Sequence, residues 1–326
     1  MSLDVLLNNF LSPPVLFFFL GLLAVVVKSD LEIPDSISKF LSLFLLFEIG
    51  MKGGHELYHS GYSPVAFKVL TVCLLLSFLV PILIYKILRH KLDVYNSGAI
   101  AAAYGSISAV TFVAAVNFLE SLSVSYGGYM MAGMALMESP AIISGLILVT
   151  LGAKGNVGKL FNGPELKSVL HESCFNGSVF LLIGSLVIGL LTASQDFYGY
   201  IPFSSNVFAI LLAFYMLDMG LLAGRRVSDL KKLGGFLVLV ALAYPIVFAL
   251  LGILLSSLLG LEKGDALLLT VLLASASHIA VPAAMRLSVP KANMSLLLFM
   301  SLCVTLTFNI SVGIPLFYML IDMFWV

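Results

Sequence analysis

Two short polar stretches interrupt hydrophobic segments of this sequence near their middles. Residues 104–111 read Tyr-Gly-Ser-Ile-Ser-Ala-Val-Thr, and residues 274–282 read Ala-Ser-Ala-Ser-His-Ile-Ala-Val-Pro. Both hold small residues and hydroxyl groups where a membrane helix is normally filled with Leu, Ile and Phe. Hydroxyl groups donate and accept hydrogen bonds without carrying charge, so a group of them suits a small oxyanion and a weakly held ion. We therefore expect the two stretches to meet near the middle of a membrane and to form a binding site.

The residues that we expect to bind substrate share small size, a hydroxyl group or an imidazole: Gly105, Ser106, Ser108, Thr111, Ser275, Ser277 and His278. An ionisable side chain inside a membrane segment is usually functional, and His278 is the one histidine of the sequence inside such a segment. Two alternatives remain. In the first, the small residues serve only to let helices pack closely. In the second, the histidine serves only to bond a neighbouring helix.

A second group of polar side chains is expected to hold a cation: Glu138, Thr307 and Asn309. Glu138 lies inside a hydrophobic segment just before Pro140, which lacks a backbone donor and frees a carbonyl group. Glu138 could bind a cation, face the cavity or pair with His278. Thr307 and Asn309 can bond backbone that a broken helix leaves free.

The composition requires a membrane protein. Of the 326 residues, 60% are hydrophobic and 10% charged, and the mean hydropathy is +1.10. Soluble domains usually carry about 25% charged residues. Several segments exceed the roughly 18 apolar residues that cross a bilayer, and they lack the alternation of membrane strands. We expect an all-α polytopic protein of the plasma (inner) membrane, surrounded by lipid.

Ten spans follow from the hydrophobic segments and the polar or Pro/Gly breaks between them, at about 12–28, 34–52, 64–88, 95–120, 126–152, 176–194, 203–223, 234–260, 265–287 and 292–324. The longest connection, 153–175, is expected to be a cytoplasmic linker. It divides the chain into a first repeat of five helices at 1–152 and a second at 176–326. Discontinuous helices from both repeats are expected to cross, with core and gate domains interleaved from both.

The two halves resemble each other in sequence. Glu48 precedes Gly50 by two residues and another glycine by six, and Asp218 precedes Gly220 and a further glycine in the same way. The polar interruptions match at nearly the same offset of about 170 residues. The paired glycines are typical of close helix packing.

The distribution of Lys and Arg predicts the orientation. With both termini outside, Lys52, Lys68 and Lys263 lie on the outer side. The rest of the 17 basic residues lie on the inner side: Lys28, Lys39, Lys86, Arg89, Lys91, Lys154, Lys159, Lys167, Arg225, Arg226, Lys231, Lys232, Arg286 and Lys291. Five spans in each half then give the halves opposite orientation. Related halves of opposite orientation are typical of secondary transporters with inverted repeats.

No pattern of an enzyme or of a bound cofactor accompanies these features. The sequence contains no P-loop, dinucleotide fingerprint, nucleophile elbow or metal-ligand cluster. A net charge of zero suggests no nucleic-acid partner, and the three cysteines are scattered without disulfide or metal spacing. We expect no catalytic residue, no cofactor and no metal beyond a coupling sodium ion.

Further motifs carry a resemblance to a known family. Residues 49–54 read Ile-Gly-Met-Lys-Gly-Gly and residues 137–141 read Met-Glu-Ser-Pro-Ala. They are similar to the motifs I-G-x-x-G-G and M-D-x-P-A of the sodium-dependent bicarbonate transporter family. The polar stretches keep part of that family's patterns F-G-x-x-S-G-S-T and S-S-S-D-I-S-G-P-P through Tyr104, Gly105, Ser108, Thr111, Ser275, Ser277, Ile279 and Pro282.

The resemblance covers nearly the whole chain. It implies ten helices in a core and a gate domain, a homotrimer, and sodium-driven import of bicarbonate by an elevator-like movement. It also implies control by a small PII-like protein on the cytoplasmic face. The alternatives are a proton-coupled or uncoupled transporter of another small anion, and a membrane sensor that binds the anion without moving it.

The chain departs from the family patterns inside the predicted site. Ala109 and Val110 replace a Gly and a Ser, while His278, Ala280 and Val281 replace an Asp, a Ser and a Gly. The lost carboxylate and hydroxyl groups bear on how sodium and the anion are held. His278 is the largest chemical change, because protonated imidazole is a cation with two donors where Asp is an anion with acceptors alone.

Overall fold

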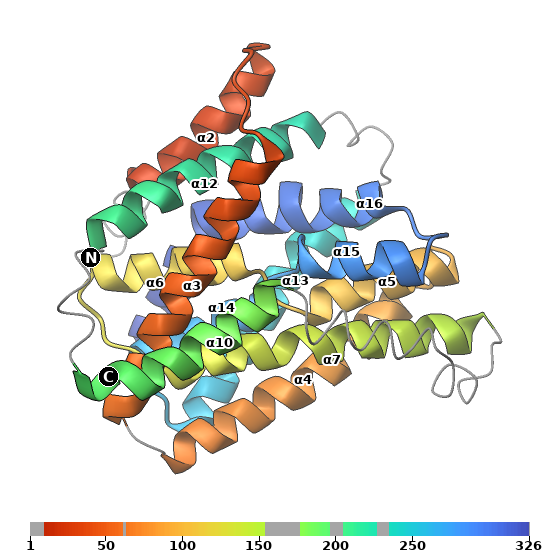
Figure 1. Cartoon of the computed structure of the whole chain (residues 1–326). Coiled ribbons are helices and arrows are strands. Elements are labelled where there is room, and N and C mark those ends of the chain that lie inside the picture. The colour runs from red at the N-terminus through yellow and green to blue at the C-terminus, as the bar shows by residue number, and fades with distance from the viewer. Residues whose placement is uncertain (1–9, 61–62, 154–176, 196–204, 227–234, 326) are drawn as a thin grey trace.

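The computed structural model describes residues 10–60, 63–153, 177–195, 205–226 and 235–325, which form helices and no strands (Figure 1). The helical elements in chain order are α2 (Pro13–Val26), α3 (Asp35–Ser60), α4 (Pro64–Leu88), α5 (Val94–Gly105), α6 (Ala109–Ser121), α7 (Tyr129–Gly152), α10 (Gly177–Thr192), η1 (Ala193–Gln195), α12 (Ser205–Arg226), α13 (Gly235–Leu259), α14 (Lys263–Ala274), α15 (Ala280–Ser288), α16 (Met294–Leu298), η3 (Phe299–Leu306), η4 (Asn309–Gly313) and α17 (Ile314–Phe324). The predicted all-helical fold is confirmed for these ranges. The predicted linker 153–175 lies, after its first residue, outside them.

Within the described residues, six segments are long and apolar enough to cross a membrane: Pro64–Leu88, Val94–Ser121, Tyr129–Gly152, Val207–Arg226, Gly235–Leu259 and Met294–Phe324. Two shorter apolar helices are Pro13–Val26 and Val179–Thr192. The spans predicted at 34–52 and 265–287 are not among these segments. Charged residues recur along α3, which also continues to Ser60, and the second of these spans is divided into the short helices α14 and α15.

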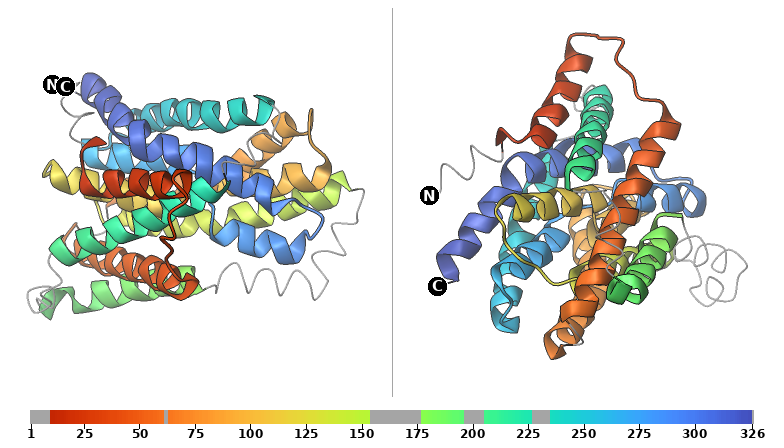
Figure 2. Two further views of the ribbon diagram at one scale, coloured as in Figure 1. Left: turned by 90° about the horizontal axis from the view of Figure 1, so that it is seen from above. Right: turned by 60° about the vertical axis from the view of Figure 1, so that its left-hand side comes forward.

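Four helices form one group, which we call the four-helix group. α2 packs along α12, α3 packs along α10, and α12 also contacts α3 (Figure 2). Glycine permits the close approach. A Cβ atom on Gly220 would lie 2.0 Å from the backbone oxygen of Phe18, and one on Gly54 would lie 2.1 Å from that of Leu186. The close packing predicted for the paired glycines is confirmed here.

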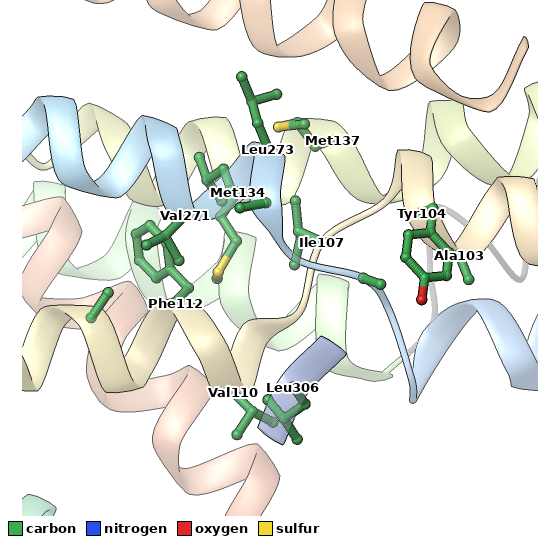
Figure 3. Close-up of a cluster of buried hydrophobic side chains, with 14 of the residues drawn as sticks. Ala103, Tyr104, Ile107, Val110, Phe112, Met134, Met137, Val271, Leu273 and Leu306 are labelled. Carbon is green, nitrogen blue, oxygen red and sulfur yellow. The ribbon is translucent and has the colours of Figure 1, made fainter. Parts of the chain in front are cut away.

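The other helices surround the two broken helices, α5–α6 and α14–α15. We call the broken helices and the helices around them, taken together, the broken-helix group. α4 packs against α5 and α7, while α14 packs against α13, α17 and α6. Their interior is apolar and close-packed around the breaks. Ile107, Phe112, Met134 and Leu273 are buried together there (Figure 3).

The last segment changes its winding where it passes the breaks. Within 294–324, Phe299–Leu306 and Asn309–Gly313 adopt the wider π-helical form. π-helical turns are rare in proteins as a whole, and many of those that occur lie at functional sites. Thr305 and Asn309, which both lie in these turns, reach the broken helices with their side chains.

Candidate functional site

The two polar interruptions touch each other, as the sequence led us to expect. The backbone N–H of Ser108 donates to Ser275 Oγ at 3.0 Å, and the backbone N–H of Ser277 donates to the oxygen of Ala103 at 2.8 Å. Each unwound segment therefore hydrogen-bonds to the other broken helix. Figure 3 shows the two unwound segments passing each other beside Ile107.

The first break begins where a glycine meets a proline ring. A Cβ atom on Gly105 would lie 2.2 Å from Pro81 Cγ of α4, so only glycine lets α5 end this close to α4. Ser106 and Ser108 then have extended backbone. The Ser108 hydroxyl accepts from the N–H of Thr111 at 3.2 Å and so caps the start of α6.

The second break is built in a similar way. α14 ends at Ala274, and Ser275 has extended backbone. The Ser275 hydroxyl donates to the carbonyl of Leu272 at 3.1 Å, and Ser277 Oγ accepts from the N–H of Val281 at 3.3 Å. Serine hydroxyls therefore replace helical hydrogen bonds at the start of α6 and on both sides of the second break.

One phenol satisfies carbonyl groups of both broken helices. In an unbroken helix, the carbonyls of Tyr104 and Leu273 would accept from the N–H groups of Ser108 and Ser277. Those N–H groups are engaged in the crossing. The Tyr244 hydroxyl of α13 contacts both freed carbonyls instead, at 2.9 Å for Leu273. The sequence did not single out Tyr244, because a tyrosine in an apolar helix reads as packing.

The C-terminal segment supplies a further donor. Asn309 Nδ2 donates to the carbonyl of Ala274 at 2.8 Å, so the prediction that Asn309 bonds freed backbone is confirmed. The Thr307 hydroxyl donates to Leu302 within its own segment at 3.4 Å. The hydroxyl of Thr305 instead bonds Tyr104 at 2.8 Å and the carbonyl of Ala241 at 2.9 Å.

A small cavity lies beside the crossing. Its volume is about 30 Å³, and its lining includes the polar side chains of Ser108, Ser277, His278, Glu138 and Ser42. A single water needs about 10–15 Å³, so the cavity suits an ion of a few atoms. Six of the predicted site residues border no part of this cavity: Gly105, Ser106, Thr111, Ser275, Thr307 and Asn309.

The ionisable groups at the cavity are not paired with each other. Neither ring nitrogen of His278 makes a hydrogen bond of ordinary geometry within the described chain, although the backbone of Ala276 lies near the ring. The considered pair between His278 and Glu138 is therefore absent from this conformation. Both side chains are buried at the cavity and remain available to a bound ion.

Several buried oxygens around the crossing also lack partners in the described residues. They are Ser106 Oγ, Thr111 Oγ1 and Asn309 Oδ1. Buried oxygens without donors are costly unless something occupies their lone pairs. Neutral hydroxyl and amide oxygens of this kind are suitable ligands for a hard monovalent cation.

A larger cavity, which we call the vestibule, continues from the small one. It has a volume of about 790 Å³ and shares Ser42, His278, Ile279 and Ala280 with the small cavity. Its walls come from both helix groups, and its charged residues are Asp35, Lys39 and Arg226 at the end where α3 begins and α12 ends. At the opposite end, a pocket between α2 and α6 measures only about 20 Å³.

The vestibule therefore connects the crossing to one end of the molecule. The predicted orientation makes this the inner side, since Lys39 and Arg226 belong to the basic residues assigned there.

A family model for the Na⁺-dependent bicarbonate transporter superfamily matches residues 13–322. No curated protein matches the chain. The resemblance inferred from the short motifs is confirmed by a match over nearly the full length.

Proposed function

Because the chain belongs to the Na⁺-dependent bicarbonate transporter superfamily, and so is a membrane transporter rather than an enzyme, we propose that it imports bicarbonate coupled to sodium. The observation that carries this proposal is the crossing of two broken helices beside a cavity of ionic size. Broken helices that cross are the usual way in which transporters of this type bind ions within a membrane.

We assign bicarbonate to the small cavity. The hydroxyls of Ser108 and Ser277 and the ring of His278 line it. The helices α6 and α15 begin beside it, at Ala109 and Ala280. A helix N-terminus offers free N–H groups and a partial positive charge of about half an elementary charge. These groups suit a monovalent oxyanion without any lysine or arginine among the described lining residues.

We assign sodium to the unpartnered oxygens around the crossing. Ser106 Oγ, Thr111 Oγ1 and Asn309 Oδ1 are buried acceptors with no donor in the described chain. Glu138 adds a carboxylate at the adjacent cavity. Thr307 is less suited than expected from the sequence, because its hydroxyl bonds its own helical segment.

The pairing of helices supports an inverted repeat and a movement between the two groups. If α2–α7 and α10–α17 are related repeats, the pair α2–α12 corresponds to the pair α10–α3, and both pairs occur. We propose that the four-helix group is the gate domain and the broken-helix group is the core domain that moves. The site would then open alternately to either side, as an elevator mechanism requires.

The family resemblance extends the proposal to the assembly. It favours a homotrimer with a PII-like regulatory protein at the cytoplasmic face. The distribution of basic residues supports a location in the plasma (inner) membrane with both termini outside.

The decisive experiment is uptake of labelled bicarbonate by purified protein in proteoliposomes. We expect uptake that depends on an inward sodium gradient and saturates with bicarbonate. Binding of bicarbonate without uptake would favour a sensor and would overturn the transport proposal.

A second candidate is proton-coupled transport of a small anion. The observation that favours it is His278, whose unbonded imidazole lines the cavity where the family pattern has an Asp. Uptake that follows a pH gradient and is indifferent to sodium would select this alternative.

A further inference from the structure

One ion pair joins the two helix groups. Lys52 Nζ of α3 lies 2.5 Å from Glu120 Oε1 near the end of α6. The same carboxylate oxygen accepts from the Tyr126 hydroxyl at 2.9 Å, and Lys52 Nζ stands 5.6 Å from the centre of the Tyr126 ring. Lys52 belongs to the four-helix group, whereas Glu120 and Tyr126 belong to the broken-helix group.

This ion pair differs in placement from two other ion pairs of the described residues. Arg225 and Glu32 lie within or beside the four-helix group, and Lys263 and Asp322 lie within the broken-helix group. Lys52 and Glu120 instead belong to different groups and link them. A relative movement of the groups must therefore change it.

The two groups are closed against each other around this ion pair. A Cβ atom on Gly128, at the start of α7, would lie 2.2 Å from the backbone oxygen of Gly53, the residue that follows Lys52. The nearby pocket that Ser12 and Asn117 line is only about 20 Å³ in volume. The vestibule at the other end measures about 790 Å³. The ion pair thus accompanies a conformation that is closed at one end and open at the other.

The sequence makes this arrangement asymmetric. At the offset of 170 residues that relates Glu48 to Asp218, the position matching Lys52 is Leu222. Leu222 lines the open vestibule. When the vestibule closes, an apolar side chain would meet the broken-helix group there, with no ammonium to form an equivalent pair.

We propose that Lys52 and Glu120 form a latch that favours the conformation with the vestibule open. The proposal rests on the alternating access proposed above. Opening the Lys52 end requires the end of α6 to move away from α3 or along it. A displacement of more than one helical turn, about 5.4 Å, carries the carboxylate out of reach of the ammonium group. The latch therefore biases the resting carrier toward the side that the vestibule faces.

The latch is also sensitive to salt. The side chains of Lys52 and Glu120 are 33% and 28% exposed, so dissolved ions reach the pair. Its effect on the conformational equilibrium is therefore modest and adjustable. The free energy that a partly exposed ion pair usually contributes corresponds to a change of about two- to fivefold in an equilibrium constant.

The test measures access to both ends without measuring transport. Asn117→Cys reports on the closed end, and Ala283→Cys reports on the vestibule. Each reporter is placed in the full chain in lipid nanodiscs, which expose both faces to a membrane-impermeant thiol reagent. Mass spectrometry quantifies modification of each cysteine separately, and the buried Cys73 serves as an internal reference.

The variants Lys52→Gln and Glu120→Gln should raise the modification rate of Asn117→Cys about two- to fivefold and lower that of Ala283→Cys. Exchanging the two charges, Lys52→Glu with Glu120→Lys, should restore both rates toward the original values. Raising the salt concentration should act on the unaltered pair in the same direction as its removal.

The matched control is the Lys263–Asp322 pair. Its atoms are 2.8 Å apart and its side chains are 40% and 39% exposed, but it lies within one helix group. Lys263→Gln should leave both reporters unchanged. Unchanged rates in the Lys52 and Glu120 variants, or an equal change in the Lys263 variant, would overturn the latch.

Failure of the latch differs from failure of the proposed function. If the carrier alternates without a latch, both reporters react and neither responds to the variants. If the chain does not alternate at all, Asn117→Cys stays unreactive in every variant and with bicarbonate and sodium present, which contradicts both proposals.

Discussion

The N–H of Ser108 donates to Ser275 Oγ at 3.0 Å, so one hydrogen bond joins two broken helices whose bonded residues are 167 positions apart. The return contact from Ser277 to Ala103, at 2.8 Å, makes the crossing reciprocal. The small cavity beside this junction is lined by both Ser108 and Ser277. A change at either serine is therefore expected to act on the bound anion and on the junction itself.

Ser108→Ala and Ser277→Ala should each weaken bicarbonate binding. Losing a hydroxyl that bonds a charged ligand costs about 1.5–3 kcal/mol, which corresponds to at least a tenfold loss of affinity. The measurement is the half-saturating bicarbonate concentration for uptake. Ser144→Ala is the control, since its buried hydroxyl bonds the carbonyl of Phe78 at 3.0 Å. Undiminished affinity in both serine variants would leave close packing as their role.

Tyr244→Phe should destabilise the junction while keeping the ring packed on Phe248. The two rings stack at 4.3 Å. Without the hydroxyl, the freed carbonyls of Tyr104 and Leu273 lose their donor, at a cost of about 1–3 kcal/mol for a buried group left unbonded. We expect a lower thermal unfolding temperature and a higher sodium concentration for half-maximal uptake. No change in either quantity would show that water or another donor replaces the phenol.

Gly105→Ala should destabilise the protein through a clash with Pro81. The added Cβ atom would lie 2.2 Å from the proline ring, in a site where overpacking costs about 1–3 kcal/mol. Gly184→Ala on α10 is the matched control, because nothing lies within 4 Å of its Cβ position. Thermal unfolding of both variants in the same detergent measures the difference. Equal stability would mean that α4 moves aside without cost.

His278→Asp should change the dependence of uptake on both pH and sodium. Asp offers a fixed negative charge to a cation, whereas imidazole is neutral or, once protonated, positively charged. We expect the unaltered protein to show the steeper pH dependence and the weaker sodium dependence between about pH 5.5 and 8. Matching profiles for both proteins would assign His278 to packing and place sodium elsewhere.

The predicted orientation can be tested without any transport measurement. Lys159→Cys should be labelled from the inside and Met323→Cys from the outside, because the basic residues gather on the inner side. Impermeant thiol reagents applied to sealed right-side-out and inverted vesicles measure this. Labelling of both positions from the same side would contradict the topology.

The breaks and their contact could be predicted from sequence, because small residues and hydroxyls inside apolar segments are a local signal. Asn309 was also predictable, since an amide in a membrane segment needs a partner. The choice of Thr307 over Thr305 could not be resolved. Thr305 lies in the π-helical range Phe299–Leu306 and its hydroxyl reaches Tyr104, and hydrophobic periodicity does not predict such winding.

The long-range partners of the site are the part that sequence could not supply. Tyr244 and Lys52 contact residues far from them in the sequence, and nothing in the sequence around either residue indicates these partners. The helix in the predicted span 34–52 extends beyond the predicted end for a related reason. The polar residues after Lys52 read as the end of a helix, but tertiary contacts with α10 and α7 accompany a helix that continues to Ser60.

The hydrogen bonds at the crossing have a consequence for the energetics of the whole cycle. They tie both broken helices to each other and, through Tyr244, to α13, so the groups that would hold the ions form one rigid body. If that body moves intact, the bound ions keep the same contacts on either side of the membrane. The dissociation constants of the ions on the two sides therefore stay close. Such a carrier is reversible: it contributes no directionality of its own, and the concentration gradients across the membrane decide whether the cell gains or loses the anion.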